Sequence, residues 1–170
     1  LMLFASAGMI LMLTTSHLLF MFIALEIMSL PIYVMVAMRR TMQSSAEAGL
    51  KYFILGGLAS AFFLYGASLI FGATGSFELE AIHSFLINSS NTAFIFYIGS
   101  ALICVALFFK IGAFPFHSWL PDVYQGAATN VTAFMGAAVK FTAFIAFARI
   151  SQNLLFIEGQ AVWFKNIFWI

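Results

Sequence analysis

FFKIGAFPFHSWLPD, residues 108–122, places a lysine, two prolines, a histidine and an aspartate in an otherwise apolar part of the chain. Gly112 and Pro115 come two and five residues after Lys110. Because proline removes a backbone donor and clashes with the preceding helical turn, we predict that a helix breaks at Gly112 and Pro115. Such a break is tolerated at membrane depth only where protein or a water-filled cavity satisfies the freed backbone groups.

The residues after the break favour a second helical piece over a simple loop. The ordinary alternative is a helix that ends at the membrane interface and turns through a proline-rich segment. However, SWLPDVYQGAAT, residues 118–129, keeps its larger apolar side chains at the spacing of a short amphipathic helix. The spaced residues are Trp119, Leu120, Val123 and Tyr124. We therefore predict a broken helix over about residues 93–127.

The composition indicates a polytopic membrane protein. Only 8% of the 170 residues are charged and 64% are hydrophobic, whereas a soluble domain has about a quarter charged and about half apolar residues. Most of this chain must therefore face lipid. The seven basic and six acidic residues are scattered, so no basic stripe predicts a nucleic-acid partner. One cysteine, Cys104, and three separated histidines lack metal-ligand spacing, so we expect no metal or cofactor bound by this chain.

Five apolar segments approach the ~20 residues that a membrane helix needs. They span residues 1–13, 18–38, 46–71, 93–114 and 131–150, and a sixth begins near residue 160. The fold class is therefore an all-α helix bundle with five transmembrane helices, one of them broken, plus the start of a sixth. Residues 151–170 would be a loop and the truncated start of that helix, as in a piece of a longer protein. Gly56 with Ser60, and Gly57 with Ala61, predict close helix packing.

Ionisable residues inside these segments are the candidate functional residues: Glu26, Lys51, Lys110 and Lys140. Each costs about 2.5–3.5 kcal/mol at the bilayer centre, even on the insertion scale that gives the lowest values. Glu26 lies far from both ends of its segment, and Pro31 loosens the helix about one turn after it. A proton route would explain these charges, and a carboxylate locked to a lysine for helix assembly is the alternative.

Three of the basic residues leave more than one interpretation open. Lys51 follows Glu47 by four residues, which favours a local ion pair, but its long stem could also reach inward to Glu26. Small neighbours of Lys140 would leave room for water or serve helix packing; they are Gly136, Ala137 and Ala143. His117 is a candidate relay seven residues after Lys110, or an ordinary structural histidine.

Three stretches together carry a family resemblance: LEIMSLPIYVMVA (residues 25–37), EAGLKYFILGGLASAFFLYG with GATGS (47–66 and 72–76), and FKIGAFPFHSWLPDVYQGAATNVTAFMGAAVKFTAF (109–144). They closely resemble the antiporter-like membrane subunits of respiratory complex I. The resemblance implies the first of two inverted five-helix repeats, over residues 1–150. It also implies that Lys51 is the partner of Glu26, that Lys110 precedes the break, that His117 is the broken-helix histidine, and that Lys140 is the lysine of the following helix.

The resemblance further implies a proton-translocating subunit of a redox-driven NADH-quinone oxidoreductase. Protons would move along Lys110 and Lys140, with Glu26 and Lys51 as an electrostatic switch. NADH, FMN, iron-sulfur clusters and quinone are then expected in partner subunits, and other membrane subunits and the lipid bilayer are the expected partners. The expected location is a bacterial inner membrane rather than an organelle membrane. A cation/proton antiporter subunit and a structural membrane spacer are the alternative functions.

Overall fold

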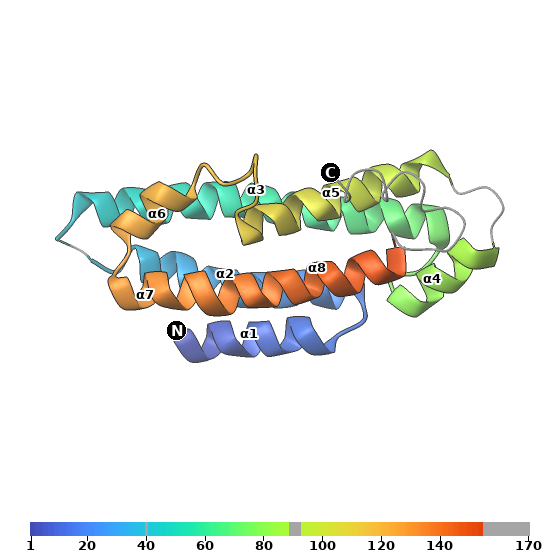
Figure 1. Cartoon of the computed structure of the whole chain (residues 1–170), viewed down its shortest axis with the longest axis horizontal. Coiled ribbons are helices and arrows are strands. Elements are labelled where there is room, and N and C mark those ends of the chain that lie inside the picture. Colours follow the sequence, from blue (N-terminus) through green and yellow to red (C-terminus); the bar gives the residue numbers. More distant parts are fainter. Residues whose placement is uncertain (40, 89–92, 155–170) are drawn as a thin grey trace.

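The computed structural model describes residues 1–39, 41–88 and 93–154, and in these residues it contains helices without strands. The helices are α1 (Met2–Thr14), α2 (Leu18–Val36), α3 (Gln43–Thr74), α4 (Leu79–Asn88), α5 (Phe94–Ile111), α6 (Leu120–Gly126), α7 (Thr129–Phe134), the π-helical segment η1 (Met135–Val139) and α8 (Lys140–Leu154). The long helices lie side by side along the long axis of the molecule, and α4 lies at one end (Figure 1).

The helices agree with the predicted apolar segments. Within the described residues, four helical stretches are long and apolar enough to cross a membrane: Leu18–Val36, Gln43–Thr74, Phe94–Ile111 and Thr129–Leu154. The shorter α1 is also apolar. Large apolar side chains such as Phe94 and Phe114 remain exposed, as expected where lipid is the solvent. The predicted sixth segment lies outside the described residues.

One helix was not expected from the sequence. The interval between the predicted apolar segments 46–71 and 93–114 contains α4. Leu79, Ile82 and Leu86 of α4 are buried, and their spacing of three and four residues is the pattern of one helix face. This helix is amphipathic rather than uniformly apolar, so a search for membrane-length apolar runs misses it.

Glycines allow close packing of the helices. A Cβ at Gly66 of α3 would lie 2.6 Å from the carbonyl oxygen of Gly99 on α5, and one at Gly99 would lie 2.8 Å from that of Gly66. Gly56 and Ser60 are buried as predicted. The other predicted pair, Gly57 with Ala61, has no close packing in the described part: both residues are exposed, because Gly57 lies about 100° around the helix from Gly56 and faces outward.

The predicted helix break is confirmed. α5 ends at Ile111, and Gly112 adopts a left-handed φ of 77° that a side chain would disfavour. The amides of Gly112 and Ala113 both donate to the carbonyl of Phe108, at 2.8 and 2.9 Å. The chain then forms α6, which runs in the same direction along the long axis as α5 (Figure 1). Trp119 at its start and Val123 within it are buried, so α6 is the amphipathic helix expected there.

Candidate functional site

Lys110 lies in the last turn of α5, two residues before the break, and only 1% of it is exposed. Its Nζ donates to the hydroxyl oxygen of Ser29 at 2.7 Å and to that of Tyr33 at 3.1 Å. The carbonyl end of a helix favours a cation, which fits a lysine in this last turn. Among the described residues, no carboxylate forms an ion pair with Lys110. The ammonium is therefore held by hydroxyl groups at the end of a helix.

Glu26 lies on the same face of α2 as these hydroxyl groups. Glu26, Ser29 and Tyr33 are spaced by three and four residues, so they follow one another along one side of the helix. The Oε1 atom of Glu26 is buried and has no hydrogen-bond partner in the described part of the chain. A buried carboxylate oxygen without a partner is costly. This face of α2 thus carries a half-buried carboxyl group, one oxygen of which lacks a partner, about one turn from Ser29, which binds Lys110.

Aromatic rings also lie close to Lys110. Its Nζ lies 5.3 Å from the ring centroid of Tyr33 and 5.8 Å from that of Tyr52. The Tyr33 and Tyr52 rings meet edge to face at 4.8 Å, and Tyr52 stacks on Trp119 at 4.6 Å. Trp119 Nε1 donates to the carbonyl of Phe109 at 3.2 Å. These ring contacts join α2, α3 and the start of α6 around Lys110.

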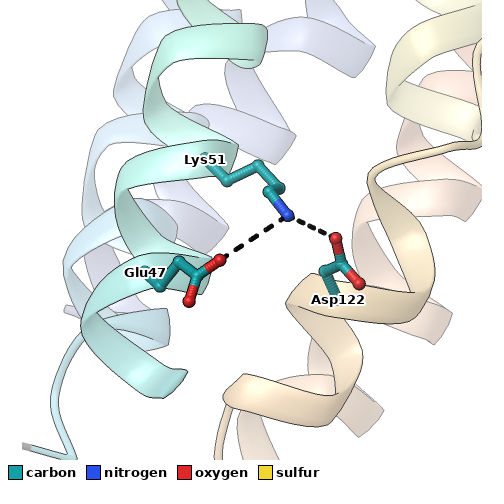
Figure 2. Close-up of polar contacts among 3 residues, drawn as sticks. All are labelled: Glu47, Lys51 and Asp122. Carbon is teal, nitrogen blue, oxygen red and sulfur yellow. Dashed lines mark hydrogen bonds and ion pairs between the residues drawn. The ribbon is translucent and has the colours of Figure 1, made fainter. Parts of the chain in front are cut away.

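Lys51 has a different partner from the one expected. Its ammonium forms an ion pair with Asp122 of α6, and a longer contact of 4.0 Å with Glu47 on its own helix (Figure 2). The local contact with Glu47 agrees with one of the two interpretations of the sequence. The inward pairing with Glu26 is wrong in this structure.

The rotation of α3 about its axis explains why Lys51 pairs with Asp122 and not with Glu26. Tyr52, the neighbour of Lys51, is 1% exposed and packs on Tyr33. One residue corresponds to about 100° around a helix, so Lys51 cannot share that inward direction. Its side chain instead extends along the side of α3 that faces α6, where Asp122 lies (Figure 2).

Lys140 begins α8 directly after η1, and it is half-buried. Its Nζ lies 5.6 Å from the ring centroid of Tyr124 on α6. Of its predicted small neighbours, Ala143 is fully buried, whereas Gly136 and Ala137 are exposed. π-Helical segments occur often at functional sites, and this one sets the register of Lys140.

His117 lies within the break and is exposed. Its ring lies 5.7 Å from that of Phe114, and no hydrogen bond joins it to Lys110 among the described residues. The structure therefore does not bring His117 together with the buried lysine.

The structure adds several site residues to those predicted from the sequence. They are Ser29, Tyr33, Tyr52, Trp119, Asp122 and Tyr124. Ser29 and Tyr33 could have been found from their helical spacing with Glu26, since all three lie on one face. Nothing local in the sequence marks Asp122 as the partner of Lys51, because the two are 71 residues apart.

A buried lysine beside a broken helix, with an acidic group one turn from its binding residue, agrees with the family resemblance in the sequence. A family model described as NADH:quinone oxidoreductase/Mrp antiporter, TM, matches residues 15–170. The chain belongs to this family. The resemblance to antiporter-like membrane subunits is thereby confirmed.

Individual members of the NADH:quinone oxidoreductase/Mrp antiporter family are similar over most of the chain. NADH-quinone oxidoreductase subunit N of Gemmatimonas aurantiaca is 46% identical over 174 residues, which cover 100% of this chain and 32% of that protein. A chain of respiratory complex I from Thermus thermophilus with bound aureothin is 44% identical, with a TM-score of 0.77 over 88% of this chain and 33% of that one. A chain of the Mrp complex from Dietzia sp. is 28% identical, with a TM-score of 0.79 over 89% of this chain and 28% of that one. The chain thus spans about a third of the length of its relatives.

Proposed function

We propose that this chain is part of a proton-translocating membrane subunit of a NADH-quinone oxidoreductase. The observation that carries the proposal is the burial of Lys110, 1% exposed, with two hydroxyl partners beside a broken helix. A charge at this depth costs about 2.5–3.5 kcal/mol, and an apolar residue would fill the space at lower cost. A role in taking up and releasing a proton would explain why a lysine is buried here despite this cost.

Lys110 and Lys140 are the proposed proton carriers, and Glu26 is the charge that influences them. At an effective dielectric constant of 20, a unit charge about 8 Å away contributes roughly 2 kcal/mol. This changes proton occupancy by more than about tenfold. Lys51 would act through its ion pair with Asp122 rather than through a pair with Glu26. A relay role of His117 stays a prediction.

The energy for translocation would come from quinone reduction in partner subunits. Moving one proton against about 150 mV takes about 3.5 kcal/mol, which a single charge pair does not supply. NADH, FMN, iron-sulfur clusters and quinone would be bound by those partners, and other membrane subunits would adjoin this one in a bacterial inner membrane. In this proposal residues 1–150 form one five-helix repeat with its broken helix at about 93–127. α8 continues to Leu154, so the predicted loop does not begin at residue 151, and residues 155–170 lie outside the described part.

Replacing Lys110 tests the proposal. In the full-length subunit within the assembled complex, Lys110→Met should lower the initial rate of NADH-driven proton pumping into vesicles by about tenfold or more. Lys110→Arg keeps the positive charge at this site and serves as the comparison for loss of charge. Normal pumping by a fully assembled Lys110→Met complex would remove Lys110 from the route.

A cation/proton antiporter is the second candidate, favoured by the family description and by the similarity to a chain of the Mrp complex. An antiporter works without an electron-transfer partner. Sodium-driven proton exchange by the full-length subunit alone in liposomes would therefore favour it. A structural spacer would instead lose assembly, with transport by the remaining complexes unchanged, when its buried charges are neutralised.

A further inference from the structure

The short helix α6 contacts two lysines from opposite sides. Asp122 and Tyr124 are two residues apart, which is about 200° around a helix. Asp122 forms the ion pair with Lys51 of α3, and the Tyr124 ring lies 5.6 Å from Nζ of Lys140. α6 therefore lies between the two basic residues and contacts both.

α6 is closely fitted against α3. Trp119, directly before α6, stacks on Tyr52 of α3 at 4.6 Å. At the other end, a Cβ on Gly126 would lie 2.8 Å from the carbonyl oxygen of Ser44. The Lys51–Asp122 ion pair joins the helices between these two contacts.

The opposite side of α6 is joined to the helix that carries Lys140. The hydroxyl of Thr132 on α7 donates to the carbonyl of Tyr124 at 3.2 Å. A Cβ on Gly136, in η1, would lie 3.8 Å from the Tyr124 hydroxyl, so the ring packs beside this segment. A cation within about 6 Å of an aromatic ring is attracted to it. Tyr124 thus has an attractive contact with the ammonium that follows η1.

The carboxylates around Lys51 are exposed, whereas both lysines are half-buried. The side chains of Glu47, Asp122 and Lys51 are 73%, 53% and 37% exposed. Lys140 is half-buried and follows η1 within a membrane-length helical stretch. The ion pair is therefore open at the surface of the described part, and Lys51 and Lys140 are both half-buried.

We infer that Asp122 and Tyr124 are positioning residues through which α6 couples the Lys51–Asp122 ion pair to the ammonium of Lys140. The inference rests on the proposed role of Lys140 in proton translocation. Loss of the ion pair removes one of the contacts that hold α6 on α3, so the Tyr124 ring is held less firmly beside Lys140. The Lys51–Asp122 ion pair thereby controls the position of a proton carrier that it does not touch.

The test uses the full-length subunit in the assembled complex, with NADH-driven proton pumping into vesicles as the readout. Asp122→Asn and Tyr124→Leu should each lower the initial pumping rate by about two- to fivefold, the factor that an interaction of cation–π strength supports. Tyr124→Phe keeps the ring and should pump normally. Gln125→Ala changes the exposed neighbour of Tyr124 and is the matched control on α6.

Two further comparisons separate positioning from simple folding effects. The charge-exchanged pair Lys51→Glu with Asp122→Lys should recover at least about half of the pumping lost in Asp122→Asn, because an ion pair again joins the helices. The double variant Asp122→Asn with Tyr124→Leu should lose no more than either single variant, because both act through α6. The inference would be overturned if the charge-exchanged pair, in a fully assembled complex, pumps no faster than Asp122→Asn. It would also be overturned if the loss of pumping rate in the double variant is the product of the two single losses.

Lys140→Met distinguishes this inference from the proposed function. If Lys140→Met pumps normally, the proposed role of Lys140 is wrong, and coupling of the ion pair to Lys140 would then have no effect on pumping. If Lys140→Met fails to pump while Asp122→Asn and Tyr124→Leu pump normally, only the coupling through α6 is wrong.

Discussion

Gly56 of α3 leaves the space that the hydroxyl group of Tyr33 occupies. A Cβ at Gly56 would overlap that hydroxyl and would lie 2.7 Å from the ring carbon Cζ. The same hydroxyl accepts the hydrogen bond from Lys110 at 3.1 Å. A residue without a side chain on α3 therefore determines where an α2 hydroxyl meets the ammonium of α5.

Gly56→Ala should reduce proton pumping by displacing Tyr33 from Lys110. Overpacking of a tight site typically costs about 1–3 kcal/mol, so we expect a loss of severalfold in the initial pumping rate of the assembled complex. Gly57→Ala is the matched control, because Gly57 has nothing within 4 Å of a built Cβ. Both changes raise helix propensity similarly. Equal pumping by the two variants would show that the space at Gly56 is unimportant.

Tyr33→Phe should weaken proton pumping while leaving the helices packed. It removes one of the two hydroxyl acceptors of Lys110 and keeps the ring that packs on Tyr52. A hydrogen bond to a charged group contributes about 1.5–3 kcal/mol. Ser29→Ala removes the other acceptor, and the double variant should lose more activity than either single one. Initial pumping rates in vesicles, normalised to assembled complex, measure this effect; wild-type rates in all three would contradict it.

Glu26→Gln should lower pumping because it removes the half-buried carboxylate that lies about one turn from Ser29. Glu80→Gln removes an exposed carboxylate from α4 and should pump normally. The measured quantity is protons pumped per NADH oxidised, which separates coupling from electron-transfer rate. If both variants keep the wild-type ratio, Glu26 has a structural role alone.

Gly66→Ala should impair assembly rather than coupling. Its Cβ would meet the carbonyl of Gly99 at 2.6 Å, so α3 and α5 would have to separate. The expected cost is about 1–3 kcal/mol, measured as a lower yield of assembled complex and a lower unfolding temperature. Gly72→Ala, in open space on the same helix, is the control. A normal yield for Gly66→Ala would mean that the close crossing is not required.

Local features of the sequence predict the helices better than the contacts between helices. The broken helix follows from Gly112 and Pro115, whose backbone chemistry acts locally, and the apolar segments follow from length and composition. α4 is missed because it is amphipathic and short. The partner of Lys51 is missed because the sequence shows only its spacing from Glu47. The rotation of α3 decides whether the side chain of Lys51 reaches Glu26 or Asp122, and it places Lys51 beside Asp122.

The amino-acid sequence by itself determined that this is a helical membrane protein with an interrupted span, because runs of apolar residues and the restrictions of glycine and proline act within a few residues. It also determined the family, through motifs that extend along most of the chain. Only the tertiary structure decided that Lys110 is bound by hydroxyl groups, that Lys51 pairs with Asp122, and that Tyr124 faces Lys140. Those contacts join residues on different helices, so they depend on how each helix is rotated and packed against its neighbours.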